Sequence, residues 1–304
     1  MSEVITKMIT LVLLMFVGYF CSKVKITGPE FNKHASKVMM DVLLSATIIQ
    51  SVLNVRPTVS NSEVFYIIAL FFLMLFISWG FGLATAKLLR IPRHQEGVSV
   101  CLVTYMNTAF VGFPIVEALY GAEAVFYASL SGIPFNLLLY SAGVLTLQGG
   151  ASEKKIAVRD VVTVPLVVTI LATGMFLFRI PLPEVVEETI STLAGGTIPI
   201  SMIIIGTSLG AVPAKEAFTD WRVYIISLVR LIICPLVIYF LMSAIVNNEM
   251  IVGILTILAA TPSGMVLTVL CIQHGQDDGL ASKGIFISTV FSAVTIPFII
   301  WLLL

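Results

Sequence analysis

One apolar segment contains the residue types needed to bind a small polar molecule inside a membrane. The stretch "YMNTAFVGFPIVEALYG" (105–121) places Asn107, Thr108, Gly112 and Pro114 in a hydrophobic run. Proline lacks a backbone N–H and frees the carbonyl four residues earlier, so we expect unpaired backbone groups here. Lipid cannot satisfy such groups, and they are tolerated only where protein or a water-filled cavity meets them.

A second apolar segment, "ILAATPSGMVLTVLCIQHG", has the same combination of a central proline and small or polar neighbours. The other prolines of the apolar segments are interpreted as ordinary kinks. Two broken helices at equivalent places in a chain indicate a substrate site near the bilayer midplane. We therefore predict that this site is lined by the following residues of the two segments: Asn107, Thr108, Gly112, Pro114, Thr261, Pro262, Ser263 and Gly264.

Three ionisable residues inside apolar segments are functional candidates, because a charge in the membrane is costly. Arg230 lies ~13 Å into its segment at 1.5 Å per residue. It could bind a carboxylate bidentately. It could instead be structural, bonding freed carbonyls near Pro235 or extending its charged end to the cytoplasmic face. Asp41 could exchange protons or pair with Lys37 at the interface. Glu117 follows Pro114 by three residues and could be a gate or coupling residue, or an exposed end charge.

The composition is that of an integral membrane protein. Of 304 residues, 58% are hydrophobic and 11% are charged, whereas soluble domains have roughly 25% charged residues. The net charge of zero gives no indication of a nucleic-acid partner. The four cysteines are far apart and form no metal-binding cluster. We expect no metal or cofactor beyond a coupled H⁺ or Na⁺. The expected partners are the lipid bilayer, a small organic anion and a second copy of the chain in a homodimer.

Ten apolar runs are long enough to cross a bilayer, which takes about 20 residues in a helix. They are approximately 4–23, 36–54, 64–87, 97–119, 123–148, 158–178, 185–211, 222–246, 250–273 and 281–303. The loops on one face then contain 13 of the 17 basic residues, and the positive-inside rule places that face in the cytoplasm. These residues are Lys23, Lys25, Lys33, Lys37, Lys87, Arg90, Arg93, Lys154, Lys155, Arg159, Lys215, Arg222 and Lys283. Both termini are therefore predicted to lie outside the cytoplasm.

The ten segments divide into two sets of five, and an odd number per half inserts the second half upside down. Sequence echoes at an offset of 156 support this division: "GYF" (18–20) matches "GMF" (174–176), and Phe65 matches Trp221. We predict an all-α membrane protein made of a 5+5 inverted repeat with proline-broken fourth and ninth helices, the architecture of many secondary transporters. The predicted parts are a first repeat (1–148), a cytoplasmic linker (149–157) and a second repeat (158–304).

The two broken segments resemble the signature regions of the auxin efflux carrier family. The similarity rests on "NTAFVGFP" followed by "YGAEA", and on "ATPSG" followed by "CIQHGQDDGLASKGIFISTVFSAVTIP". This family includes plant PIN proteins and bacterial carriers of malate, malonate and related acids. The resemblance implies a crossover fold like that of bile-acid sodium symporters, with a transport domain moving against a scaffold domain. It also implies that Asn107, Gly112, Pro114 and Pro262 line the substrate site.

The chain departs from the family pattern in two places. Ser45 in "DVLLSAT" stands where members often have proline. Met265 and Val266 replace polar residues that are common after the second broken proline. The resemblance therefore gives carboxylates as a class and no particular carboxylate.

These observations favour a secondary transporter of a small mono- or dicarboxylate in the plasma membrane. The alternatives are a cation/proton antiporter of the same architecture and a transporter-like membrane sensor. The antiporter usually needs buried acidic residues at the broken helices, and none lies between Asn107 and Pro114 or beside Pro262. An enzyme is not expected, because no H-E-x-x-H motif, membrane aspartate pair or membrane histidine is present.

Overall fold

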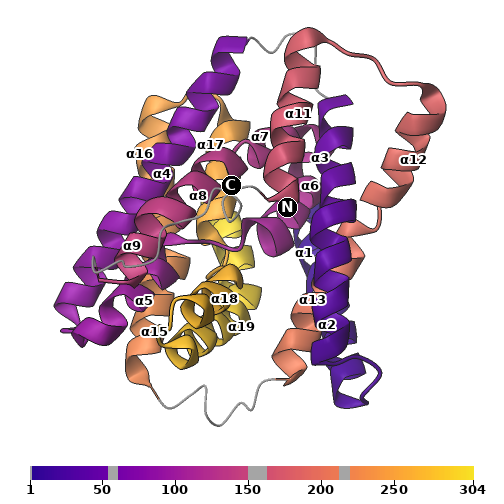
Figure 1. Cartoon of the computed structure of the whole chain (residues 1–304). Helices are drawn as coiled ribbons and strands as arrows, with labels where there is room; N and C mark the ends of the chain where they lie inside the picture. The colour runs from indigo at the N-terminus through magenta and orange to yellow at the C-terminus, as the bar shows by residue number, and fades with distance from the viewer. Residues whose placement is uncertain (1, 54–60, 150–162, 212–219) are drawn as a thin grey trace. The chain divides into compact units, whose positions relative to one another are not determined.

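The computed structural model is built from helices (Figure 1). It describes residues 2–53, 61–149, 163–211 and 220–304, and these ranges contain no strand. The helices run in the following order, where η marks π-helices: α1 (Ser2–Lys23), α2 (Pro29–Val38), η1 (Met39–Leu43), α3 (Leu44–Leu53), α4 (Asn61–Leu88), α5 (Arg93–Thr104), η2 (Thr108–Gly112), α6 (Phe113–Tyr120), α7 (Ala122–Ser129), α8 (Gly132–Leu138), η3 (Leu139–Gly143), α9 (Val144–Leu147), α11 (Val164–Phe178), α12 (Glu184–Ala194), α13 (Thr197–Ala211), α15 (Trp221–Leu228), η4 (Val229–Ile233), α16 (Cys234–Ile245), α17 (Glu249–Ala260), α18 (Val266–Gln273) and α19 (Asp278–Leu303).

Six helical runs in the described ranges are long and apolar enough to cross a bilayer, which confirms a multi-pass membrane protein. They are Pro29–Leu53, Ser62–Leu88, Ala122–Leu147, Glu184–Gly210, Trp221–Ile245 and Asp278–Leu303. The other four expected spans correspond to shorter apolar helices, Ile9–Lys23, Thr108–Tyr120, Val164–Phe178 and Glu249–Ala260. The expected linker lies outside the described residues except for Gly149, as do Lys154, Lys155, Arg159 and Lys215.

The chain folds into two compact units, and each takes segments from both halves of the sequence. Unit 1 comprises Met1–Ile68, Ala109–Ile133 and Val162–Val212. Unit 2 comprises Ala69–Thr108, Pro134–Val161 and Pro213–Leu304.

In unit 1, helices α1 and α13 pack closely along their length (Figure 1). Glycine permits this approach, because a Cβ atom at Gly206 would overlap the backbone of Met15 and Tyr19. A Cβ atom at Gly18 would likewise overlap the backbone of Ile203. Small residues at helix interfaces allow such close backbone contact, and lipid-embedded helices depend on it because no hydrophobic force drives them together.

Polar side chains also connect α13 to α2, to α3 and to the turn between α1 and α2 in unit 1. Such hydrogen bonds contribute about 0.6 kcal/mol each in membrane proteins, so they favour one register over others rather than supplying most of the stability. The three pairs, with the distances between their side-chain atoms, are Thr27 and Thr207 (3.0 Å), Asn32 and Ser208 (2.8 Å), and Thr47 and Thr197 (2.7 Å).

In unit 2, the short helix α5 is enclosed by close contacts that involve glycine. A Cβ atom at Gly97 of α5 would overlap the backbone of Thr146. Gly82 of α4 faces the backbone of Val100, and Gly284 of α19 faces the side chain of Leu102. Most of α5 is buried by these neighbours. The helix that leads into the first broken segment is therefore held from several sides.

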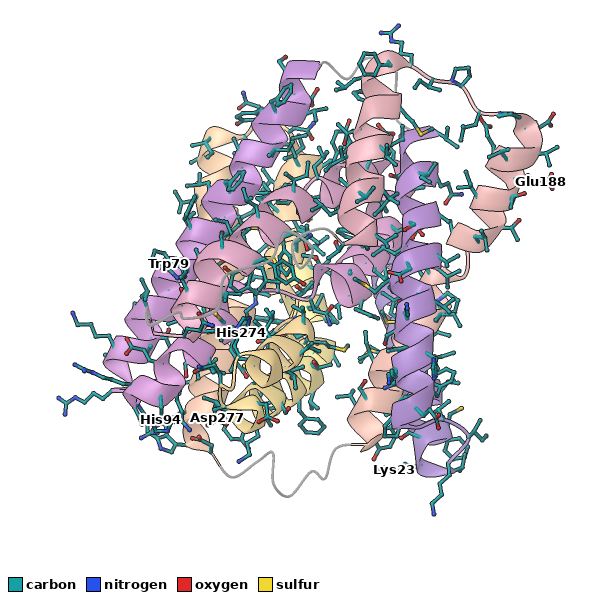
Figure 2. The ribbon with its side chains drawn as sticks, viewed as in Figure 1. Lys23, Trp79, His94, Glu188, His274 and Asp277 are labelled. Carbon is teal, nitrogen blue, oxygen red and sulfur yellow. The ribbon has the colours of Figure 1, made fainter. Side chains whose placement is uncertain are left out.

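Asp277 connects the starts of α5 and α19 in unit 2. It is the N-cap of α19 and accepts a hydrogen bond from the Leu280 N–H at 2.8 Å. Its second carboxylate oxygen accepts from Gln95 Nε2 at 2.8 Å. Burial by itself raises the pKa of the Asp277 carboxyl, but the two hydrogen bonds lower it and the nearby His94 and Lys283 add to their effect. The net pKa lies below the ordinary value. Figure 2 shows His94 and Asp277 at the same end of the helices.

The first prediction concerns the contact between α1 and α13. Gly206→Ala should lower the free energy of unfolding by about 1–3 kcal/mol, because backbone cannot yield to the added methyl group as a side chain would. The measurement is the thermal unfolding midpoint (Tm) of the purified protein in detergent. Gly174→Ala is the matched control, since nothing lies within 4 Å of a Cβ atom there. Equal Tm values for the two variants would contradict the packing described.

The second prediction concerns pH. Because folding depresses the pKa of Asp277, its contribution to stability is present at neutral pH and is lost as the pH falls through the folded-state pKa. Asp277→Asn should therefore lower Tm at pH 7, and its difference from wild type should shrink on acidification. Asp278→Asn removes the same charge from an exposed neighbour and should cost less. If the Tm difference between wild type and Asp277→Asn stays constant with pH, this account is wrong.

Candidate functional site

Two helices of unit 2 are interrupted within the two segments that the sequence predicted to be broken, and the second of these breaks lies at the predicted proline. Helix α17 ends at Ala260, and α18 begins at Val266. Pro262 accounts for this break, because it has no N–H to donate and disfavours helical backbone at the residue before it. Thr261 is accordingly extended, with φ −69° and ψ 152°.

The other break lies at Tyr105–Asn107 and not at Pro114, which corrects the position expected from the sequence. Helix α5 ends at Thr104, and Tyr105 is extended with φ −96° and ψ 114°. The chain becomes helical again at Thr108, in the π-helix η2, and Pro114 lies in the first turn of α6. Proline is tolerated there because the preceding π-turn changes the hydrogen-bond register of the helix.

The two unwound segments cross and pair through their backbones, and we call this pairing the crossover. Met106 and Ser263 form an isolated antiparallel bridge. The Asn107 N–H donates to Pro262 O at 2.8 Å, and the Gly264 N–H donates to Tyr105 O at 2.9 Å. Each segment therefore satisfies backbone groups that the other exposes by leaving the helical conformation. This pairing meets the requirement that unwound backbone in a membrane find its partners within the protein.

The side chain of Ser263 ties the crossover to the end of α5. Its Oγ donates to Leu102 O at 2.7 Å, and its N–H donates to Ser288 Oγ of α19 at 3.2 Å. Both serines are buried. Gly264 favours this close approach, because a Cβ atom there would lie 3.2 Å from Met106 O, which is a tight contact.

Arg230 binds the C-terminal ends of both interrupted helices. It lies in η4 and is fully buried. Its Nε donates to Thr261 O at 3.1 Å, its Nη1 to Val103 O at 3.1 Å and its Nη2 to Leu258 O at 3.4 Å. These carbonyls lie at helix ends, where partial negative charge concentrates. Leu258 O also accepts from the Thr261 hydroxyl at 2.8 Å and from the Thr261 N–H at 3.3 Å. In this structure the guanidinium has the expected structural role of binding backbone carbonyls, but these belong to α5 and α17 and not to the backbone near Pro235.

Tyr105 is a participant that the sequence did not single out. Its hydroxyl donates to Leu138 O at 2.9 Å, and its ring packs edge-on against Phe135, with 5.7 Å between ring centroids. Ser288 was missed as well. Both are polar groups within apolar segments, which was the available signal, but their partners are distant in sequence or are backbone carbonyls.

The structure brings six of the eight predicted lining residues together in unit 2. They are Asn107, Thr108, Thr261, Pro262, Ser263 and Gly264. The polar side chains among them are almost completely buried. The other predicted residues, Gly112, Pro114, Glu117 and Asp41, belong to unit 1. Within unit 1, the Oε2 atom of Glu117 is buried and has no hydrogen-bond partner among the described residues.

The charge at the crossover is positive. The sequence has no Asp or Glu from 97 to 116 or from 250 to 276, which includes both unwound segments. Arg230 is the one charged residue between 223 and 248. Such an arrangement attracts an anion more readily than a cation.

Comparisons with known proteins agree with this architecture. A sequence model of the family described as membrane transport protein matches residues 3–300. An uncharacterized transporter of Methanocaldococcus jannaschii is 25% identical over 96% of this chain and 96% of its own length. An uncharacterized transporter of Methanothermobacter thermautotrophicus is 24% identical over 97% of this chain and 96% of its own. The match confirms the family predicted from the two signature regions: the chain belongs to the membrane transport protein family of auxin efflux carriers.

Proposed function

We propose that this transporter moves a small organic anion, a mono- or dicarboxylate, across the plasma membrane by alternating access around the crossover. The main support is that two interrupted helices meet beside a buried arginine. Neither unwound segment contains an acidic residue. Helix N-termini beyond the breaks favour anionic groups, as in other transporters with broken helices. The side chains at the crossover are buried, so a substrate reaches them only when the surrounding helices move.

An inverted 5+5 repeat, with ten spans and both termini outside the cytoplasm, is part of this proposal. Its support is the recurrence of helix bounds at the offset seen in the sequence. Helix α17 begins and ends 156 positions after α5. The run Asp278–Leu303 begins and ends 156 positions after Ala122–Leu147. Asn107 and Ser263 are related by the same offset. Two near-equivalent halves can pack in two ways around one site, which is the basis of alternating access.

The third prediction tests the substrate class. A carboxylate that binds the folded protein stabilises it by mass action, by about 2.7 kcal/mol at a concentration 100 times its Kd. We expect at least one organic acid in a panel of mono- and dicarboxylates to raise Tm of wild type, and Asn107→Ala to lose this shift. Asn32→Ala is the matched control, because it removes a partly buried amide of unit 1 that hydrogen-bonds Ser208. It should lower Tm but retain the shift.

Two results would argue against this function. No shift with any carboxylate, alongside a clear shift with Na⁺ or Li⁺ alone, would favour the cation/proton antiporter instead. A carboxylate shift that persists in Asn107→Ala but disappears in Asn32→Ala would move the binding site away from the crossover.

The fourth prediction concerns coupling to protons. We include in the proposal that Glu117 exchanges the coupled proton, since its carboxylate has a buried oxygen with no partner in the described part of the chain. Uptake of the identified carboxylate into proteoliposomes should then respond to a pH gradient in wild type and not in Glu117→Gln. Glu188→Gln, which removes an exposed carboxylate of unit 1, should behave as wild type. An unchanged response in Glu117→Gln would exclude this role.

A further inference from the structure

Three backbone carbonyls from two helix ends of unit 2 surround the guanidinium of Arg230. Val103 O comes from the last turn of α5, and Leu258 O and Thr261 O come from the last turn and C-cap of α17. Each helix end carries partial negative charge, so bringing the two ends together is unfavourable unless a cation lies between them. Converging carbonyls at the ends of broken helices are also the ligands that transporters use for coupling Na⁺.

A side chain of the protein already occupies this position. The guanidinium of Arg230 donates one hydrogen bond to each of the three carbonyls, at 3.1, 3.1 and 3.4 Å. Its planar group directs donors along three fixed directions, which a lysine ammonium on a flexible stem does not do. The guanidinium stays protonated at neutral pH, so the positive charge is permanent.

We propose that Arg230 is a built-in cation of the crossover, taking the helix-end carbonyls that would otherwise bind Na⁺, so that transport requires no Na⁺ at this point. The inference deepens the proposed function, and the part that concerns transport rests on that function. Its structural part, the replacement of a bound ion by a side chain, concerns the crossover alone. An added Na⁺ would meet carbonyls that are already engaged and would be repelled by the guanidinium.

Arg230 is therefore a positioning residue that fixes the two helix ends relative to each other. It need not touch the substrate to affect transport, because Asn107 and Ser263 are held on the same two segments. Removal of the Arg230 side chain leaves three carbonyl oxygens around an empty space that a cation had filled. That position should accept a small cation from solution, either Na⁺ or methylguanidinium, which replaces the lost group directly.

The fifth prediction follows from this exchange. Tm of purified wild type should agree within about 1 °C between NaCl and choline chloride at equal ionic strength, because Arg230 already occupies the carbonyls of the crossover. Arg230→Ala should unfold at lower temperature in choline chloride. Na⁺ or methylguanidinium should raise its Tm by about 4 °C once the cation exceeds its Kd roughly tenfold. Arg93→Ala is the matched control, since it removes the charge of an exposed arginine from the opposite end of α5. It should show no response to either cation.

Two outcomes would overturn the inference. One is a Na⁺-dependent Tm in wild type. The other is an Arg230→Ala protein that folds and ignores both cations. If Arg230→Ala is not recovered even when expressed and purified with methylguanidinium, wild type and Arg230→Lys decide the question. Both keep a cation at this position and should be indifferent to Na⁺, so Na⁺ dependence in either contradicts the proposal.

The test separates this inference from the proposed function. If no carboxylate stabilises wild type but Arg230→Ala gains cation dependence, the anion transport proposal fails and the built-in cation stands. If a carboxylate stabilises wild type only when Na⁺ is present, anion transport stands and the built-in cation fails. Uptake by wild type at equal initial rates in Na⁺ and choline media supports both.

Discussion

Backbone that leaves the helical conformation inside a bilayer must find its hydrogen-bond partners within the protein. Here the two unwound segments are each other's partners, through the Asn107 N–H to Pro262 O and the Gly264 N–H to Tyr105 O. Four further carbonyls at the helix ends accept hydrogen bonds from side chains: Leu102 O from Ser263, and Val103 O, Leu258 O and Thr261 O from Arg230. The glycine at 264, the serine at 263 and the buried arginine all follow from this one requirement.

The same requirement explains which features the sequence could predict. Membrane spans and the α17 break were predictable, because apolar length and a missing proline N–H are local properties. The α5 break was placed wrongly at Pro114, since nothing in the residue types at 105–107 forbids a helix. That break depends on the antiparallel segment supplied by residues 261–264, which is a long-range contact.

The roles of individual residues were predictable to a similar, limited extent. The sequence identified Arg230 as costly and therefore important but left its role open between binding a substrate carboxylate, bonding carbonyls near Pro235 and extending to the cytoplasmic face. Its partners are carbonyl oxygens, which every residue has, so no side-chain pattern could reveal them. Tyr105 and Ser288 were overlooked for the same reason, because both hydrogen-bond backbone groups of distant segments.

The glycine contacts around α5 have a mechanical consequence. A helix that could slide or rotate by a fraction of a turn needs neighbours whose side chains can adjust. Gly97 and Gly82 instead bring α5 into contact with backbone, and the side chain of Leu102 fills the space left by Gly284. Helix α5 is therefore packed closely against α4, α9 and α19. We therefore expect these helices to move together with the crossover when it is displaced.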